Sequence, residues 1–151
     1  EDIVRVAHFV KNDLKEYSST SAMSVGPIGA DLLHAAAFGI SIEKICLRES
    51  FLSYAEIASS KSYKSSFIPF TVAGAIEKYD LADLIAKISP RKVLIMNPVS
   101  ADGMSSSHTQ NELILAFPNK VSEENDQGEN LEVETGIAEP MIWNNVFEWL
   151  K

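Results

Sequence analysis

The stretch RKVLIMNPV at positions 91–99 constrains the fold more than any other part of the sequence, because its centre is continuously apolar. Such a run is typical of a strand in a parallel sheet whose two faces are both covered. A second stretch, SIEKICL at 41–47, predicts another core strand. Helices must then flank the sheet, so the sequence predicts an α/β fold.

The remaining elements alternate with these strands. Two shorter stretches, 17–24 and 131–136, predict the first and last strands. Apolar spacing and capping residues predict helices in five ranges: 2–15, 26–38, 79–90, 105–117 and 140–151. Four strands separated by helices predict a three-layer αβα arrangement around a parallel sheet of about four strands.

Two of the predicted helices carry specific expectations. In the helix over 105–117, the apolar face is expected to be Leu113, Ile114 and Phe117, and Pro118 is expected to end it. In the last helix, the expected sheet-facing stripe is Trp143, Val146, Phe147 and Leu150.

Chain length and composition predict one domain. The 151 residues, 46% of them hydrophobic, suffice for one core, so 1–151 is expected to be a single, partial domain. Residues 49–79 predict an irregular insertion with one short helix, and 121–130 an acidic loop. The chain begins at Glu1 rather than Met, so we expect a processed chain or a fragment. No apolar run is long enough for a membrane span, so membrane insertion is not expected.

Charge and motif content exclude several classes of function. The net charge of −8 would repel phosphate backbones, which disfavours nucleic-acid binding. The histidines and Cys46 lack the paired spacing of a metal site, so no metal is expected, and Cys46 is interpreted as a buried hydrophobe. The GPIG stretch lacks the lysine and extra glycines of a nucleotide site, so no cofactor is expected.

One stretch comes close to a nucleophile elbow, the strand-to-helix turn that carries the serine of many hydrolases. In SAMSVGPIGADLLHAAAF, residues 21–38, Ser24 lies between the small residues Ala22 and Gly26, one substitution from the G-x-S-x-G pattern.

Three further stretches support a family resemblance. The succession GPIGADLLHAAAF, IEKICLRESFLSY and YDLADLIAKISPRKVLIMNPVSADG resembles the C-terminal half of α/β-hydrolases of the acetyl xylan esterase and dienelactone hydrolase group, especially carbohydrate-associated esterase-like proteins of gut-type bacteria. The resemblance covers roughly residues 1–103, and 131–150 in pattern. It implies that the N-terminal half of the sheet is missing and that the strand over 17–24 has an uncovered edge.

The resemblance leaves two alignments of the elbow. In the first, Ser24 is the apex. In the second, which the spacing to the HAAAF helix favours, Gly26 is the apex and Gly29 is the second of the paired glycines. A buried helix cannot shift by two residues without turning its apolar face about 200°. The second alignment gives an apex without a side chain.

The other members of a catalytic triad are incomplete. Asp102 stands where the resemblance places the acid, although an Asp-Gly turn explains it equally well. The loop after the last strand has no histidine, so His108 is the candidate for a displaced base. Tyr54 and Arg91 are candidates for a pocket rim.

Three functions therefore stand open, of which the last in rank is a sugar-binding module with Tyr54, Trp143 or Trp149 as a stacking platform. The first is a degenerate hydrolase-like domain, a pseudoenzyme that is non-catalytic alone and accessory to a larger polysaccharide-processing protein. The alternative is an active carbohydrate ester hydrolase using Ser24, Asp102 and His108, with a polysaccharide ester as substrate. The expected partner is the missing N-terminal half, a partner domain or a second chain covering the edge strand. The resemblance also implies an exported bacterial protein.

Overall fold

The computed structural model describes residues 2–13, 19–39, 42–125 and 130–151, and within them the chain forms one parallel sheet. Its spatial order, β1-β2-β3-β4, is the chain order, and every neighbouring pair is parallel. The strands are β1 (Ser21–Val25), β2 (Lys44–Arg48), β3 (Lys92–Met96) and β4 (Leu131–Glu134). Residues 17, 18 and 41 of the expected strands lie outside the described residues.

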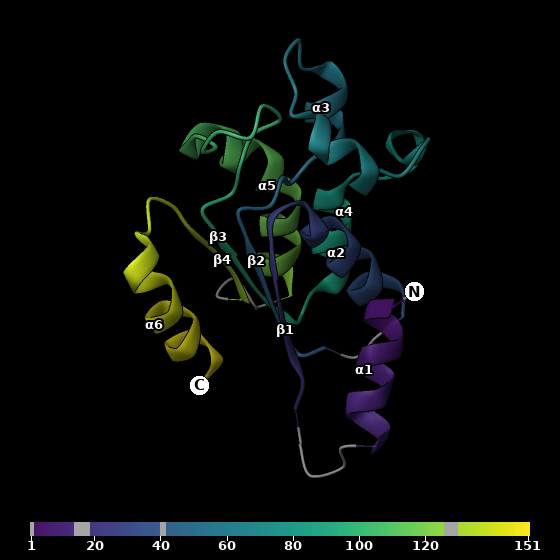
Figure 1. Ribbon diagram of the computed structural model, residues 1–151, viewed down its shortest axis with the longest axis vertical. Coiled ribbons are helices and arrows are strands. Elements are labelled where there is room, and N and C mark those ends of the chain that lie inside the picture. Colours follow the sequence, from purple (N-terminus) through teal and green to yellow (C-terminus); the bar gives the residue numbers. More distant parts are fainter. Residues whose placement is uncertain (1, 14–18, 40–41, 126–129) are drawn as a thin grey trace.

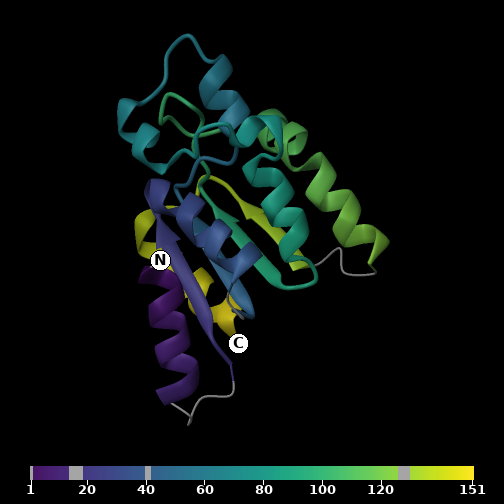
Figure 2. The ribbon, with the colours of Figure 1, turned by 90° about the vertical axis from the view of Figure 1, so that its right-hand side faces the viewer.

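Helices cover both faces of the sheet (Figure 1). On one face α2 packs against α4 and α4 against α5, with α1 beside α2 near the β1 edge (Figure 2). On the other face lies α6. These helices are α1 (Asp2–Asp13), α2 (Gly29–Phe38), α4 (Leu81–Ile88), α5 (His108–Glu124) and α6 (Glu139–Leu150). The predicted α/β fold with three layers and four parallel strands is confirmed.

Two apolar clusters explain why the central strands are continuously apolar. Val93 and Ile95 of β3 belong to the larger cluster, which includes residues of α2 and α4. Leu94 of β3 and Cys46 of β2 point to the opposite face and pack with Ile142 of α6. Because successive side chains of a strand point to opposite faces, a strand covered on both faces needs apolar residues at every position.

The insertion between β2 and α4 stands above the carboxyl ends of the strands (Figure 1). It consists of short elements: α3 (Tyr54–Ser59) and the 3₁₀ segments η2 (Ser65–Phe70) and η3 (Ala75–Glu77). The carboxylate of Asp80, which caps α4, also accepts hydrogen bonds from the Ser53 hydroxyl and from the backbone N–H groups of Tyr54 and Ala55. One side chain thus joins the starts of α3 and α4.

The expected end of α5 is wrong, and of its expected face only Ile114 packs against the core. The helix continues through Pro118 to Glu124, and Leu113 and Phe117 are 74% and 54% exposed. Its buried stripe is instead Asn111, Leu115, Pro118 and Ser122. We infer that packing of this stripe outweighs the loss caused by proline inside a helix, which is about 3 kcal/mol. Residues 121–124 of the expected acidic loop are therefore helical, and residues 126–129 of it lie outside the described residues.

The expected face of α6 is only partly correct. Val146 is buried, but Trp143 and Phe147 are 52% and 59% exposed. Val146 and Ile142, one turn apart, are the buried α6 residues that pack against the sheet. The expected stripe shares Val146 with the buried face, but the helix is rotated so that Ile142, rather than Trp143 and Phe147, packs beside it. Among the described residues, no helix has the length and apolar character needed to cross a membrane.

Candidate functional site

The turn between β1 and α2 begins at a glycine. Gly26 follows directly after β1 and has a φ of +75°, a left-handed conformation that glycine adopts without steric cost. A Cβ at this position would meet no atom within 4 Å among the described residues. The structure therefore places Gly26 in a strand-to-helix turn, with open space where a side chain would project.

Ser24 lies below this turn. It belongs to β1, is 7% exposed, and its Oγ has no hydrogen-bond partner among the described residues. The hydroxyl faces the start of α2, because it would lie 3.4 Å from a Cβ at Gly29. The buried Ser24 hydroxyl lies on the face of the sheet that α2 covers, so it is shielded from a substrate that approaches the turn.

Gly29 is required for a close approach between α2 and the segment after β2. A Cβ at Gly29 would lie 2.8 Å from Cβ of Ser50 and still nearer its Oγ. The Ser50 hydroxyl donates a hydrogen bond of 2.9 Å to the carbonyl oxygen of Gly26. Ser50, which the sequence analysis did not single out, thus supports the turn from beneath.

Asp102 makes the contacts of a local turn. Its Oδ1 accepts hydrogen bonds from the backbone N–H of Met104 at 3.0 Å and from the Ser100 hydroxyl at 2.7 Å. These two bonds, the first the stronger influence, hold the pKa of the exposed Asp102 carboxyl below its ordinary value. Gly103 follows with a φ of +84°, as an Asp-Gly turn requires.

His108 is the first residue of α5, and its side chain is 82% exposed. Its Nε2 lies 3.3 Å from a carboxylate oxygen of Glu112, one turn along the same helix. In the described part of the chain, no hydrogen bond joins Ser24, Asp102 and His108 to one another. The catalytic triad of the alternative function, an ester hydrolase, therefore stays a prediction, because no described contact joins its three members.

The loop after β4 is held by an asparagine that follows β3. Asn97 follows β3 and has a φ of +47°. Its side-chain amide donates a hydrogen bond of 2.8 Å to the carbonyl oxygen of Ile137, and its Oδ1 accepts one of 3.0 Å from the Ile137 N–H. Asn97 was not among the predicted site residues, although asparagine is enriched in left-handed backbone.

The two candidate rim residues lie at different ends of the sheet. Tyr54 lines a pocket in the insertion, above the carboxyl ends of the strands. Arg91 precedes β3 at the amino ends and donates hydrogen bonds to the carbonyl oxygens of Ala36, Ile42 and Ile88. Arg91 therefore joins the start of β3 to α2 and α4 at the amino ends of the strands. It does not line the pocket of Tyr54.

His34, on the helix after the turn, is a packing residue. Its Nδ1 lies 2.7 Å from the carbonyl oxygen of Ala30, and its Nε2 lies 2.9 Å from the Tyr79 hydroxyl. The described residues contain no group of three or more histidine, cysteine and acidic side chains able to hold a metal ion.

Comparisons with known proteins agree with the fold. No family model and no curated protein match the sequence. One similar solved structure is described as a carbohydrate esterase family 15 (CE15) glucuronoyl esterase from Caldicellulosiruptor kristjansonii. The two share 18% sequence identity with a TM-score of 0.59, over 85% of this chain and 41% of the esterase chain. The chain therefore has an esterase-like fold of the α/β-hydrolase kind and spans less than half the length of that esterase.

Proposed function

We propose that this chain is the C-terminal half of a degenerate α/β-hydrolase-like domain, non-catalytic by itself and accessory to a larger polysaccharide-processing protein. The observation that supports the proposal is the turn at Gly26, which has backbone and open space at the position that the favoured alignment assigns to the nucleophile. A serine hydroxyl also needs a base to remove its proton, and the exposed His108 contacts Glu112 rather than a serine. The likeness to a carbohydrate esterase supports a carbohydrate-processing context.

Labelling with a fluorophosphonate probe tests the absence of catalysis. We expect no labelled serine in the folded chain and acetyl-ester hydrolysis at the rate of buffer. Labelling that maps to Ser24 by mass spectrometry and disappears in Ser24→Ala would overturn the proposal and establish the alternative hydrolase. The matched control is Ser106→Ala, because Ser106 is also a buried serine whose hydroxyl lacks a hydrogen-bond partner among the described residues.

Restoring a hydroxyl at the apex gives a sharper test. The Gly26→Ser variant places an oxygen in the open space above the turn, at a strain cost of about 1–2 kcal/mol for the left-handed backbone. We expect this variant to stay inactive toward acetyl esters, since no described contact supplies its hydroxyl with a base. Hydrolysis by Gly26→Ser that is lost in Gly26→Ser/His108→Ala would show that a functional base had remained.

The partner in this proposal is the missing N-terminal half of the sheet, which would add a strand to β1. Among the described strands β1 pairs with β2 alone, so its outer edge is available. Apolar side chains near this edge are exposed, including Val25 at 48% and Ile28 at 43%. The coverage of 41% of the similar esterase agrees with a further sheet half.

Hydrogen exchange tests this partner. In the chain alone, the amides of β1 that point away from β2 should exchange fast, whereas those of β3 should be protected. In a protein that contains the N-terminal half of the sheet, the same β1 amides should become protected. Unchanged exchange of β1 in the longer protein would overturn the proposed partner.

A further inference from the structure

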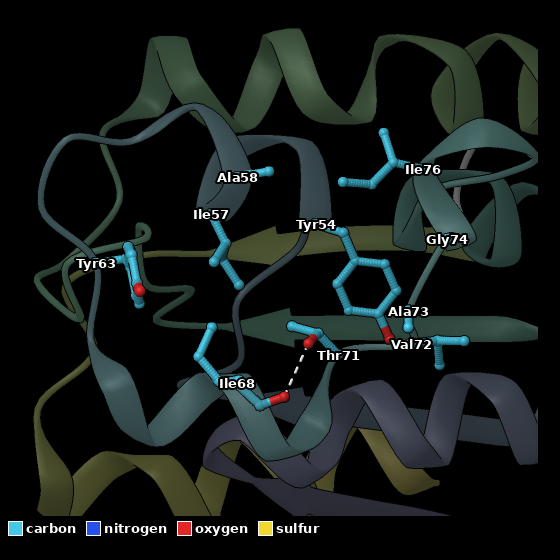
Figure 3. A pocket seen from close by; sticks show the side chains of 10 residues that line it. All are labelled: Tyr54, Ile57, Ala58, Tyr63, Ile68, Thr71, Val72, Ala73, Gly74 and Ile76. Atoms are coloured by element: carbon cyan, nitrogen blue, oxygen red, sulfur yellow. Dashed lines mark hydrogen bonds between the residues drawn. The ribbon is translucent and has the colours of Figure 1, made fainter.

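The insertion between β2 and α4 encloses a pocket of its own (Figure 3). Its volume is about 330 Å³, and it is walled by α3, by η2 and by the segment that leads into η3. Cavities that bind small molecules measure about 300–1,000 Å³, so this one is at the lower end of that range. Its size fits one or two fused rings.

The pocket gathers exposed apolar side chains around a buried floor. Tyr54 and Ile57 of α3 are 3% and 5% exposed, and they form the floor. Around them, four large apolar side chains are about half exposed: Tyr63 at 50%, Ile68 at 46%, Val72 at 46% and Ile76 at 50%. Apolar surface concentrated in this way marks a binding site, because a ligand that covers it removes apolar area from water.

Two hydroxyl groups that line the pocket, those of Tyr54 and Thr71, already donate their protons. The Tyr54 hydroxyl donates to the carbonyl oxygen of Phe70 at 3.2 Å, and the Thr71 hydroxyl donates to that of Ile68 at 2.8 Å, the dashed line of Figure 3. Each oxygen therefore offers lone pairs, so it accepts rather than donates. None of the ten lining residues is charged.

Two tyrosine rings line the pocket. Figure 3 shows the rings of Tyr54 and Tyr63 apart from each other, with Ile57 and Ile68 between them. Burial raises the pKa of the Tyr54 hydroxyl above its ordinary value, which keeps this residue neutral. A flat ring seated against either tyrosine would gain offset or edge-to-face contacts beyond the burial of its area.

We propose that this pocket binds a small neutral aromatic molecule that carries one hydrogen-bond donor, that is, a phenol-type ligand. The rings and the isoleucines contact its apolar body, and the hydroxyl oxygens of Tyr54 and Thr71 accept its single proton donor. The proposal does not rest on the proposed function, because a domain without catalytic activity still binds ligands through such a pocket.

The test is a titration with 2-naphthol, followed by the methyl NMR signals of Ile57, Ile68 and Ile76. We expect saturable shifts of these three signals with a dissociation constant of about 0.1–1 mM, as ligand efficiencies predict for a molecule of this size. Its methyl ether, 2-methoxynaphthalene, has no donor and should bind about fivefold more weakly, the effect of one hydrogen bond. Shifts that do not saturate, or equal binding of the two compounds, would overturn the proposal.

Two variants of the same helix separate the pocket from the rest of the surface. Ala55 and Ala58 are both exposed alanines of α3, but only Ala58 lines the pocket. Ala58→Trp should fill the pocket and weaken 2-naphthol binding at least tenfold, whereas Ala55→Trp should leave it unchanged. Equal effects of the two variants would overturn the assigned site.

A third variant tests the assigned ligand chemistry. Tyr54→Phe/Thr71→Val removes both hydroxyl acceptors, so it should abolish the preference for 2-naphthol over its methyl ether. The matching methyl spectra of folded variant and parent serve as the check of integrity. A preference that persists in this variant would contradict the assigned acceptors.

Discussion

The hydroxyl of Ser50, directly after the bend that ends β2, donates a hydrogen bond of 2.9 Å to the carbonyl oxygen of Gly26 at the end of β1. This bond joins the carboxyl ends of two neighbouring strands beneath the turn into α2. The same serine lies so close to Gly29 that a side chain there would overlap it. The turn therefore depends on the absence of a side chain at one position and the presence of a hydroxyl at another.

The first prediction concerns this close approach. Gly29→Ala should lower the free energy of unfolding by about 1–3 kcal/mol, because its methyl group must displace Ser50. Ser50→Gly removes both overlapping atoms, so Gly29→Ala should cost less in that background, with a coupling of about 1 kcal/mol or more. Urea denaturation of the four proteins of this double-mutant cycle measures the coupling.

A remote glycine provides the control for this cycle. Gly136 also has a positive φ, +71°, but a Cβ there would meet nothing within 4 Å among the described residues. Gly136→Ala should cost only its backbone strain, and its effect should be the same in the parent chain and in the Ser50→Gly background. Additivity at Gly29 as well would contradict the steric explanation.

The second prediction concerns the loop after β4. Asn97→Gly should lower the free energy of unfolding by about 2 kcal/mol through the loss of two hydrogen bonds to Ile137. Asn97→Ala should cost about 1 kcal/mol more, since alanine is strained at a φ of +47°. In both variants the Ile137 amide should lose its protection from hydrogen exchange. Equal stability of the alanine and glycine variants would show that the backbone relaxes from this conformation.

The sheet was the most predictable part of the molecule. A strand covered on both faces must be apolar at every position, so RKVLIMNPV revealed both its own burial and the presence of helices on both sides. The turn at Gly26 was also predictable from a local pattern. The sequence places this glycine between a strand and a buried helix, and the structure gives it a φ of +75°.

Helix faces were less predictable, because they depend on packing between elements far apart in sequence. The bulky residues Leu113, Phe117 and Trp143 were expected to face the core, yet all three are more than half exposed. Asn111 and Pro118 of α5 are buried instead, which a hydrophobicity pattern does not indicate. The contacts of Asp80 and Asn97 were missed for a related reason, since each joins segments that no local pattern relates.

The third prediction concerns Asp80. Its carboxylate accepts hydrogen bonds from the N–H groups of Tyr54 and Leu81 at 2.6 and 2.7 Å, so it stabilises the first turns of both α3 and α4. Asp80→Ala should lower the free energy of unfolding by about 2–4 kcal/mol, because it removes the cap of α4 and the acceptor of the first two N–H groups of α3. Asp83→Ala, which removes a single hydrogen bond to the Asp80 N–H, should cost about 1 kcal/mol. Chemical denaturation measures both, and equal losses would contradict the joint role.

The fourth prediction concerns the single cysteine. Burial, with a smaller effect of Glu134, raises the pKa of the Cys46 thiol from its ordinary value of 9.0 to about 11, although Arg48 lowers it slightly. The side chain is 1% exposed between β2 and α6. A neutral, inaccessible thiol is a poor nucleophile, so Cys46 should not react with Ellman's reagent at pH 8 until urea unfolds the chain.

The same shift makes stability depend on pH in one direction. Between pH 9 and 11 the unfolded thiol loses its proton while the folded thiol keeps it, so the folded state binds more protons. The stability that the neutral thiol contributes is therefore present in full below pH 9 and is lost as the pH rises through 11. Two pKa units correspond to about 2–3 kcal/mol. Cys46→Val keeps the apolar contacts without a titrating group, so the free energy of unfolding of the parent should fall more steeply than that of the variant over this range. Parallel curves for the two proteins would show that Cys46 ionises equally in both states.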